Sequence, residues 1–338
     1  MSKEVKQNML RPRAKKLPPI TEEMWLKVNE EYRYLVEEFL SVQDFSAHTK
    51  KQYTSALRQF GWFVYERLGN KPLYKITKRE FSRFLGYLRN ERQMSSSSVN
   101  FRKAAVSTLN NFIENIIADE EENYKNFRNF TRGMPTTSRN KVYEKKLVTF
   151  DEFKMMLEAL EEEKDYLGVA WLATAYIVGA RRAEIKQFKT EMLNYEVNED
   201  NYFNSHYVRG KGQGSDGKQL RFIISGEVLP YWQKWVEHRG YEHEYIFTTK
   251  HNGEIKVISD TWANYFCQNK LSKIAGRRIT PHIFKASCIT YHLERGVPIE
   301  FVSKHIAMHE SVETTIQHYD LRSFEDKLGE VYKGAFKL

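Results

Sequence analysis

Residues 280–288 read TPHIFKASC, and this short stretch decides how the second half of the chain is interpreted. Pro281 suits the first turn of a helix, because its φ is already helical and its missing N–H is not needed there. His282 and Lys285 then lie three residues apart, so both side chains project from one face of the opening turn. Such a pair at a helix start is a candidate phosphate-binding site. The stretch therefore predicts a helix. It leaves open whether Lys285 takes part in a reaction at a phosphate or only binds one.

The charge of the whole chain points to the same kind of ligand. The 338 residues suffice for about two domains and carry a formal net charge of +9. Hydrophobic residues make up 41% and charged residues 29%, as in ordinary globular proteins. An excess of Lys and Arg on this scale favours nucleic acid over an anionic membrane surface as the partner. A generally basic protein without such a partner is the alternative.

Several features predict a soluble cytoplasmic protein with no membrane partner. Cys267 and Cys288 lie in apolar-patterned segments without metal-ligand spacing, which fits a reducing compartment. The N-terminus is basic but lacks the apolar core of a signal peptide. The longest apolar run, VAWLATAYIVG at 169–179, is shorter than the roughly 20 residues of a membrane span. We expect it to be a buried helix.

Capping signals and periodicity predict a mainly α fold with a small antiparallel β-sheet. Ser46, Thr77 and the serine cluster at 95–98 can each cap a helix with an apolar stripe. Thr149 with Glu152 forms a capping box. Two β-rich runs around a Gly/Ser/Asp turn within 201–225 predict a hairpin. We expect a flexible basic arm at 1–21, a helical domain at 22–118, a linker at 119–147 and a second domain at 148–338.

Basic residues lie on the polar faces of the helices expected in the first domain. Such faces are often only solvated, but the overall charge makes contact with DNA phosphates at least as plausible. The residues concerned are Lys50, Lys51, Arg58, Arg102 and Lys103.

Four segments of the second domain carry the chemistry, although each is weak alone. They are VGARRAEI (178–185), RGKGQGSDGK (209–218), the stretch from Pro281 to Ser311, and VETTIQHYD (312–320). In this order they resemble the tyrosine recombinase (phage-integrase-like) family. The resemblance covers roughly residues 28–325, including S-x-x-T-x-x-x-Y at 46–53. The matching positions are Gly179, Arg181, Glu184, Lys211, His282, Lys285, His309, Thr314, Thr315 and Tyr319.

The resemblance implies a core-binding domain at 22–118, a recombinase-type catalytic domain at 148–338 and a role for each matching residue. Tyr319 would attack a DNA phosphodiester and form a 3′-phosphotyrosyl link, so no cofactor or metal is needed. Arg181 would grip the non-bridging oxygens. His282 and His309 would contact the same phosphate and handle the proton of the nucleophile. Lys211 would protonate the leaving 5′-oxygen. Arg209 and Lys218 would contact DNA, with Lys218 the substitute proton donor, and Glu184 would be a structural partner.

The sequence departs from the family pattern at two positions. Lys285 replaces the second arginine, and a lysine is a point charge rather than a planar fork. Losing one preorganised donor at a comparable site slows a reaction by roughly 10²–10³. Met308 replaces the glycine before the second histidine, which would strain the backbone if φ is positive there.

Two functions therefore stay open. The first is a site-specific recombinase of a prophage or other mobile element, acting on double-stranded DNA as a tetramer in the nucleoid of a bacterial host. The second is a catalytically inactive DNA-binding transcriptional regulator, such as a phage repressor, working as a monomer or dimer. Lys285 and Met308 favour the regulator, whereas Arg181 and Tyr319 favour the enzyme. A zinc site at His305 and His309 is not favoured, because a third ligand is missing.

Overall fold

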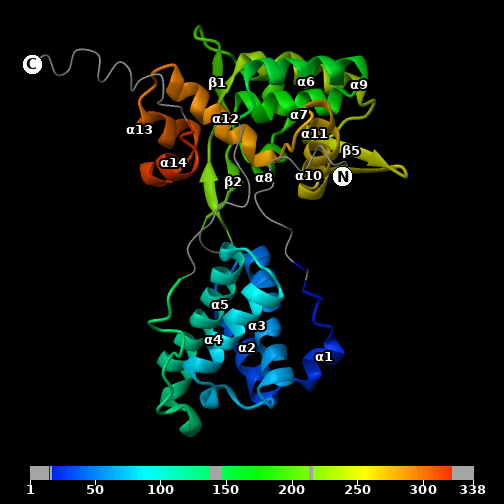
Figure 1. Ribbon diagram of the computed structural model, residues 1–338. Coiled ribbons are helices and arrows are strands. Elements are labelled where there is room, and N and C mark those ends of the chain that lie inside the picture. The colour runs from blue at the N-terminus through cyan, green and yellow to red at the C-terminus, as the bar shows by residue number, and fades with distance from the viewer. Residues whose placement is uncertain (1–14, 16, 137–146, 213–215, 322–338) are drawn as a thin grey trace, which may run out of the picture. The chain divides into compact units, whose positions relative to one another are not determined.

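A computed structural model describes residue 15 and residues 17–136, 147–212 and 216–321 (Figure 1). The described residues form two compact units. One is built from residues up to 136 together with residues 212, 216 and 217, and the other from residues 147–211 and 218–321. The predicted fold class is confirmed, since helices dominate both units and the strands form small antiparallel sheets. Most of the expected basic arm at 1–21 lies outside the described residues, although Leu17 and Ile20 pack against the first unit.

The N-terminal unit is entirely helical among its described residues. The helices predicted after Ser46, Thr77 and the serine cluster begin there, because the side chains of Ser46, Thr77 and Ser95 accept backbone N–H groups of the first turns. Thr21 caps the first helix in the same way. The elements are α1 (Glu22–Lys27), α2 (Glu30–Val42), α3 (Ala47–Arg67), η2 (Leu73–Lys75), α4 (Lys78–Gly86), η3 (Tyr87–Glu91), α5 (Ser96–Asn115), η4 (Ile117–Asp119) and η5 (Glu122–Tyr124).

The start of the expected linker at 119–147 instead packs into this unit. Tyr124, Phe127 and Phe130 are buried in the same aromatic core as Phe60 and Phe81. Burial of three large rings stabilises the packing of this segment on the core by several kcal/mol in total. The sequence does not show this packing, because the charged residues between the rings are typical of a linker. Residues 137–146 of the expected linker lie outside the described part of the chain.

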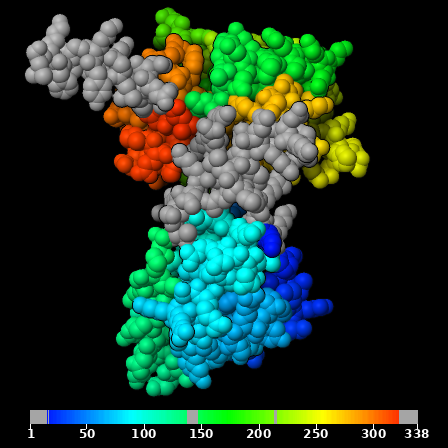
Figure 2. All heavy atoms as spheres, in the orientation of Figure 1, coloured from blue at the N-terminus to red at the C-terminus, as the bar shows by residue number. Residues whose placement is uncertain are grey.

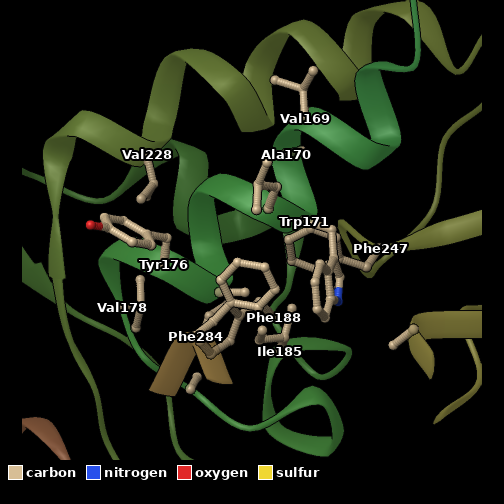
Figure 3. Close-up of a cluster of buried hydrophobic side chains, with 14 of the residues drawn as sticks. Val169, Ala170, Trp171, Tyr176, Val178, Ile185, Phe188, Val228, Phe247 and Phe284 are labelled. Atoms are coloured by element: carbon tan, nitrogen blue, oxygen red, sulfur yellow. The ribbon is translucent and has the colours of Figure 1, made fainter. Parts of the chain in front are cut away.

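The C-terminal unit surrounds one helix that is buried on all sides. Helix α7 packs against α6, α9 and α12, and its Trp171 meets Phe284 of α12 edge to face (Figure 3). This confirms the expected buried helix at 169–179. The helices are α6 (Phe150–Glu162), α7 (Tyr166–Ile177), α8 (Arg182–Ile185), η6 (Thr190–Asn194), η7 (Gly226–Val228), α9 (Leu229–His238), α10 (Asp260–Tyr265), η8 (Phe266–Leu271), α11 (Ser272–Ile274), α12 (Pro281–Glu294), α13 (Ile299–Phe301), η9 (Val302–Ile306) and α14 (Val312–His318).

The strands form three two-stranded antiparallel sheets. The predicted hairpin within 201–225 is two nested pairs, in which Phe203 faces Ile224 and Arg209 faces Gln219. The strands are β1 (Tyr202–Asn204), β2 (Val208–Gly210), β3 (Lys218–Leu220), β4 (Ile223–Ser225), β5 (Thr248–His251) and β6 (Glu254–Val257). Among the described residues, no helix combines the length and the apolar character required to cross a membrane.

Candidate active site

Arg181 lies at a sharp corner between the buried helix α7 and the short helix α8. The corner needs Gly179, whose φ is +65° and where a Cβ would approach Cys288 Sγ of α12 to 2.8 Å. Glu184 then accepts the Arg181 backbone N–H at 2.7 Å and its guanidinium at 2.9 Å. Glu184 is buried, whereas the Arg181 side chain stays 21% exposed. The guanidinium is therefore held in one orientation and still accessible, as a phosphate ligand requires.

Helix α12 starts at Pro281 and carries both His282 and Lys285, as predicted. The Lys285 side chain is only 1% exposed. Its ammonium donates hydrogen bonds to the carbonyl oxygens of Gly179 at 3.3 Å and Ala307 at 2.8 Å. The group that was expected to meet a phosphate is thus directed at the main chain, while His282 is exposed.

His309 follows η9 and is almost fully buried. Its Nδ1 lies 2.8 Å from Thr315 Oγ1, and Thr315 in turn donates to Ser303 Oγ at 2.9 Å. Because the Thr315 proton is used in that second bond, Nδ1 of His309 carries the proton that joins it to Thr315. The other ring nitrogen, Nε2, is buried and has no hydrogen-bond partner among the residues that the structure describes. The ring is thus fixed in orientation with one polar atom left to contact a substrate.

Both histidines are kept neutral by their surroundings. Burial, followed by the charges of Lys285 and Arg181, lowers the pKa of His309 to about 3. Desolvation by neighbouring protein atoms, followed by the charges of Arg182 and Arg181, also lowers the pKa of His282. His309 is thus a buried neutral imidazole beside several cations, and strongly perturbed groups of this kind cluster at functional sites.

Tyr319 comes directly after α14 and its ring packs against that of His309, with centroids 4.6 Å apart and the planes tilted by 42°. Its backbone N–H donates to Thr315 O at 3.0 Å, and its carbonyl accepts from Thr290 Oγ1 of α12 at 3.0 Å. The ring is half-buried against the apolar residues of α12 and η9. The main chain therefore fixes the start of the Tyr319 side chain independently of its phenol group.

The expected proton donor lies on the hairpin that follows α8. Lys211 is exposed directly after Gly210, where an added Cβ would come within 2.3 Å of Leu220 Cδ1 across the sheet. Lys218 Nζ of β3 lies 3.8 Å from Oε1 of Glu310, the residue that follows His309. Arg209 is exposed on β2, and its N–H donates to Gln187 at 2.9 Å.

The structure brings most of the predicted site residues together in one unit. Arg181 and Lys285 both lie close enough to shift the pKa of His282 and of His309, and His309 contacts Tyr319. In Figure 2 the segments from α12 to α14, orange to red, lie next to one another at the surface of this unit. In the described part of the chain, the Lys211 side chain forms no hydrogen bond or ion pair with these residues, so its role as proton donor stays a prediction. The catalytic roles of the others stay predictions as well.

The DNA-contact residues predicted in the N-terminal unit fall on two packed helices. Lys50 and Lys51 of α3 are exposed. Arg58 forms a two-pronged ion pair with Glu22, and Arg102 of α5 donates to Gln59 at 2.7 Å. Lys103 donates to a backbone carbonyl of Met134. Three of the five would have to exchange these partners in order to bind phosphate.

The sequence did not indicate the residues whose hydrogen bonds position the site residues. Ser303 orients Thr315, Thr290 holds the Tyr319 backbone, and Ala307 accepts from Lys285. The family pattern includes Thr314 and Thr315, but the sequence indicates no role for either residue. Small hydroxyl residues on an apolar helix face are the available signal, since a buried hydroxyl needs a hydrogen-bond partner.

Met308 provides a direct test of backbone strain beside His309. The φ of Met308 is +55°, which lies in the left-handed region where a residue other than glycine is strained. Met308→Gly and Met308→Ala both remove the side chain, but only glycine tolerates this φ without strain. We expect the glycine variant to be about 1 kcal/mol more stable than the alanine variant. Denaturant unfolding measures the difference, and an alanine variant of equal or greater stability would contradict it.

Lys285 should make stability depend on pH in the alkaline range. Burial, followed by the charge of Arg181, lowers the pKa of Lys285 to about 8. An unfolded lysine has a pKa of about 10.4. Between the two values the unfolded chain binds more protons, so the free energy of unfolding rises with pH. We expect wild type to gain on the order of 3 kcal/mol relative to Lys285→Met over this range. A difference that stays constant with pH would contradict this.

Comparison with known proteins agrees with this geometry. Residues 146–325 match the Phage integrase family, and residues 33–119 match the family described as "Phage integrase, N-terminal SAM-like domain". The chain belongs to the phage integrase family. The resemblance to tyrosine recombinases drawn from the motifs is thereby confirmed.

Two curated relatives span most of this family member. The SPbeta prophage-derived recombinase-like protein YomM of Bacillus subtilis is 54% identical over 334 residues, covering 98% of this chain and 100% of the relative. Tyrosine recombinase XerA of Pyrococcus horikoshii is 26% identical over 285 residues, covering 83% of this chain and 87% of the relative.

Two solved structures share the fold of this integrase-family chain. The site-specific recombinase XerH, bound to a palindromic difH substrate, has a TM-score of 0.64 at 14% identity, covering 95% of this chain and 98% of the other. The Tn1549 transposon integrase, in complex with transposon right end DNA, has a TM-score of 0.63 at 14% identity, covering 90% of this chain and 99% of the other.

Proposed function

We propose that this protein is a DNA strand transferase that cuts and rejoins double-stranded DNA through a 3′-phosphotyrosyl intermediate at Tyr319. The observation that carries the proposal is the position of Tyr319 against His309, in the same unit as the accessible, Glu184-oriented guanidinium of Arg181. The family membership supports it, and so do relatives whose names describe recombinases.

The residues of this chain supply the nucleophile, the stabilising charge and both proton transfers that the reaction needs. The Tyr319 oxygen attacks phosphorus while the bond from phosphorus to the 5′-oxygen breaks, so one phosphodiester bond replaces another. Arg181 stabilises the charge on the non-bridging oxygens. The proton of Tyr319 passes to His282, whose lowered pKa keeps its ring neutral and able to accept it. Lys211 protonates the departing 5′-oxygen. Attack by the freed 5′-hydroxyl of another strand reverses these steps and releases Tyr319.

Duplex DNA is the proposed partner, bound mainly through its phosphates. Lys50 and Lys51 of α3 and Arg209 of β2 supply exposed cations for this purpose. We expect affinity for a specific duplex to fall by roughly 10³-fold or more between about 50 and about 200 mM salt. Fluorescence anisotropy over that range measures the slope. Affinity nearly independent of salt would contradict a phosphate-dominated interface.

A nicked-duplex trapping assay tests the proposed reaction. Duplexes selected by the protein from a random-sequence pool are nicked close to the mapped binding site, so that a short cleaved strand diffuses away and religation stops. An SDS-resistant band of protein and DNA supports the strand transferase. Tight binding without such a band on any nicked duplex would overturn it and leave a DNA-binding protein without cleavage activity.

Recombination between two DNA sites implies four chains acting together. We expect native mass spectrometry to find a complex of four chains with two duplexes at micromolar concentration. Such an assembly would act at the nucleoid of a bacterial host. A single chain or dimer on one duplex at all concentrations would instead suit a regulator.

A further inference from the structure

We propose that Lys285 is a positioning residue that ties the backbone segment of Arg181 to that of His309, rather than a ligand of the DNA phosphate. The inference rests on the proposed function, because it concerns the same site. It gives Lys285 a different task from the phosphate-binding one that its sequence position suggests.

The two hydrogen bonds of Lys285 are placed symmetrically with respect to the site. One carbonyl belongs to Gly179, two residues before Arg181, and the other to Ala307, two residues before His309. The first segment follows α7 and the second follows η9, which are far apart in the sequence. A single ammonium group therefore joins the main chains that present the guanidinium and the imidazole.

Lysine suits this position for electrostatic and geometric reasons. Helices α7 and η9 both end near the ammonium, and the negative end of a helix dipole favours a cation. The three N–H groups of an ammonium point in separate directions, so they can reach carbonyls on two different segments. The planar fork of arginine suits two oxygens of one phosphate better. The 1% exposure of Lys285 keeps it away from the surface at which DNA must bind.

The tie also acts on the strained turn before His309. Ala307, which accepts the shorter bond, is followed by Met308 with its φ of +55°. Without the bond from Lys285, this carbonyl loses a buried partner and the turn can relax to an unstrained conformation. His309 and its contact with Tyr319 would then shift, although neither residue touches Lys285 through a hydrogen bond in the described structure.

The same unit offers a matched control in Arg239. This residue is also a buried cation that donates to main-chain carbonyls, those of Tyr241, His243, Tyr245 and Ile246. It lies at the end of α9, and none of these carbonyls belongs to a site segment. Arg239→Met therefore removes a buried cation and its carbonyl bonds without changing the segments of Arg181 and His309.

The experiment compares wild type, Lys285→Met, Lys285→Arg and Arg239→Met on a nicked duplex whose cleaved phosphate has been mapped with wild type. The substrates carry sulfur in place of one non-bridging oxygen, as the separate Rp and Sp isomers. Single-turnover rates and DNA dissociation constants are measured with each. We expect Lys285→Met to cleave roughly 100-fold more slowly with an unchanged dissociation constant and an unchanged Rp/Sp rate ratio. Arg239→Met should cleave at the wild-type rate, and Lys285→Arg should not exceed it.

The outcomes distinguish a positioning residue from a ligand of the DNA phosphate. A changed Rp/Sp ratio in Lys285→Met, or a Lys285→Arg variant faster than wild type, would assign Lys285 to the phosphate and overturn the proposal. Amide hydrogen exchange of the same proteins without DNA provides a readout that does not require cleavage. Exchange at Arg181 and His309 should accelerate in Lys285→Met and not in Arg239→Met. Unchanged hydrogen exchange would overturn the positioning role of Lys285, even if wild type never cleaves DNA. Absence of cleavage by wild type would overturn only the proposed function.

Discussion

Tyr319→Phe is expected to abolish the covalent protein–DNA complex, with a loss of at least about 10⁴-fold in the rate of its formation. Phenylalanine has no oxygen to attack phosphorus, and the remaining groups cannot replace a nucleophile. The backbone bonds of Tyr319 to Thr315 and Thr290 do not use the phenol, so the fold and the ring contact with His309 should persist. The measurement is the SDS-resistant band on a nicked duplex, together with the DNA dissociation constant.

The control for this variant is Tyr265→Phe, which removes the hydroxyl of an exposed tyrosine on α10. It should form the covalent complex at the wild-type rate. Both variants should bind DNA within a few-fold of wild type. Covalent complex formation that persists in Tyr319→Phe would mean that another residue is the nucleophile.

Lys211→Ala is expected to cleave an ordinary duplex roughly 10²–10⁴ times more slowly than wild type, because the leaving 5′-oxygen then lacks its proton donor. A duplex with sulfur in place of the bridging 5′-oxygen removes this requirement, since a thiolate leaves without being protonated. Lys211→Ala should therefore approach the wild-type rate on the sulfur substrate. Single-turnover cleavage of both substrates by both proteins measures the effect.

Lys218→Ala provides the comparison, because Lys218 lies on the same hairpin and pairs with Glu310. It should lose less activity on the ordinary duplex and gain nothing specific from the sulfur substrate. If the sulfur substrate restored Lys218→Ala and left Lys211→Ala slow, the proton donor would be Lys218.

The fold was predictable where local chemistry decides it. Ser46, Thr77 and Thr149 accept the N–H groups that their positions before apolar stripes imply, and each helix begins there. The apolar run at 169–179 is the central helix because its side chains are apolar on every face. These features depend on neighbours within a few residues, so one sequence suffices to reveal them.

The sequence indicates which candidate site residues to compare, but it does not indicate their hydrogen-bond partners. Glu184 was expected to be a structural partner, and it accepts hydrogen bonds from Arg181, three residues before it. The two carbonyls that Lys285 contacts lie 106 and 22 residues away in the sequence, and no local pattern indicates them. The burial of Tyr124 beside α1–α5 has the same origin, because long-range packing overrides the charged composition around it.

The most direct test of the central claim is identification of the atom that carries the DNA. The SDS-resistant complex of wild type with a nicked duplex is digested with nuclease and protease, and the remaining nucleotide–peptide adduct is sequenced by mass spectrometry. We predict one adduct, at Tyr319, joined to the 3′-phosphate of the cleaved strand, with the other strand end released as a 5′-hydroxyl. An adduct at another residue, a 5′-linked phosphate, or bound DNA that never becomes covalent would contradict it.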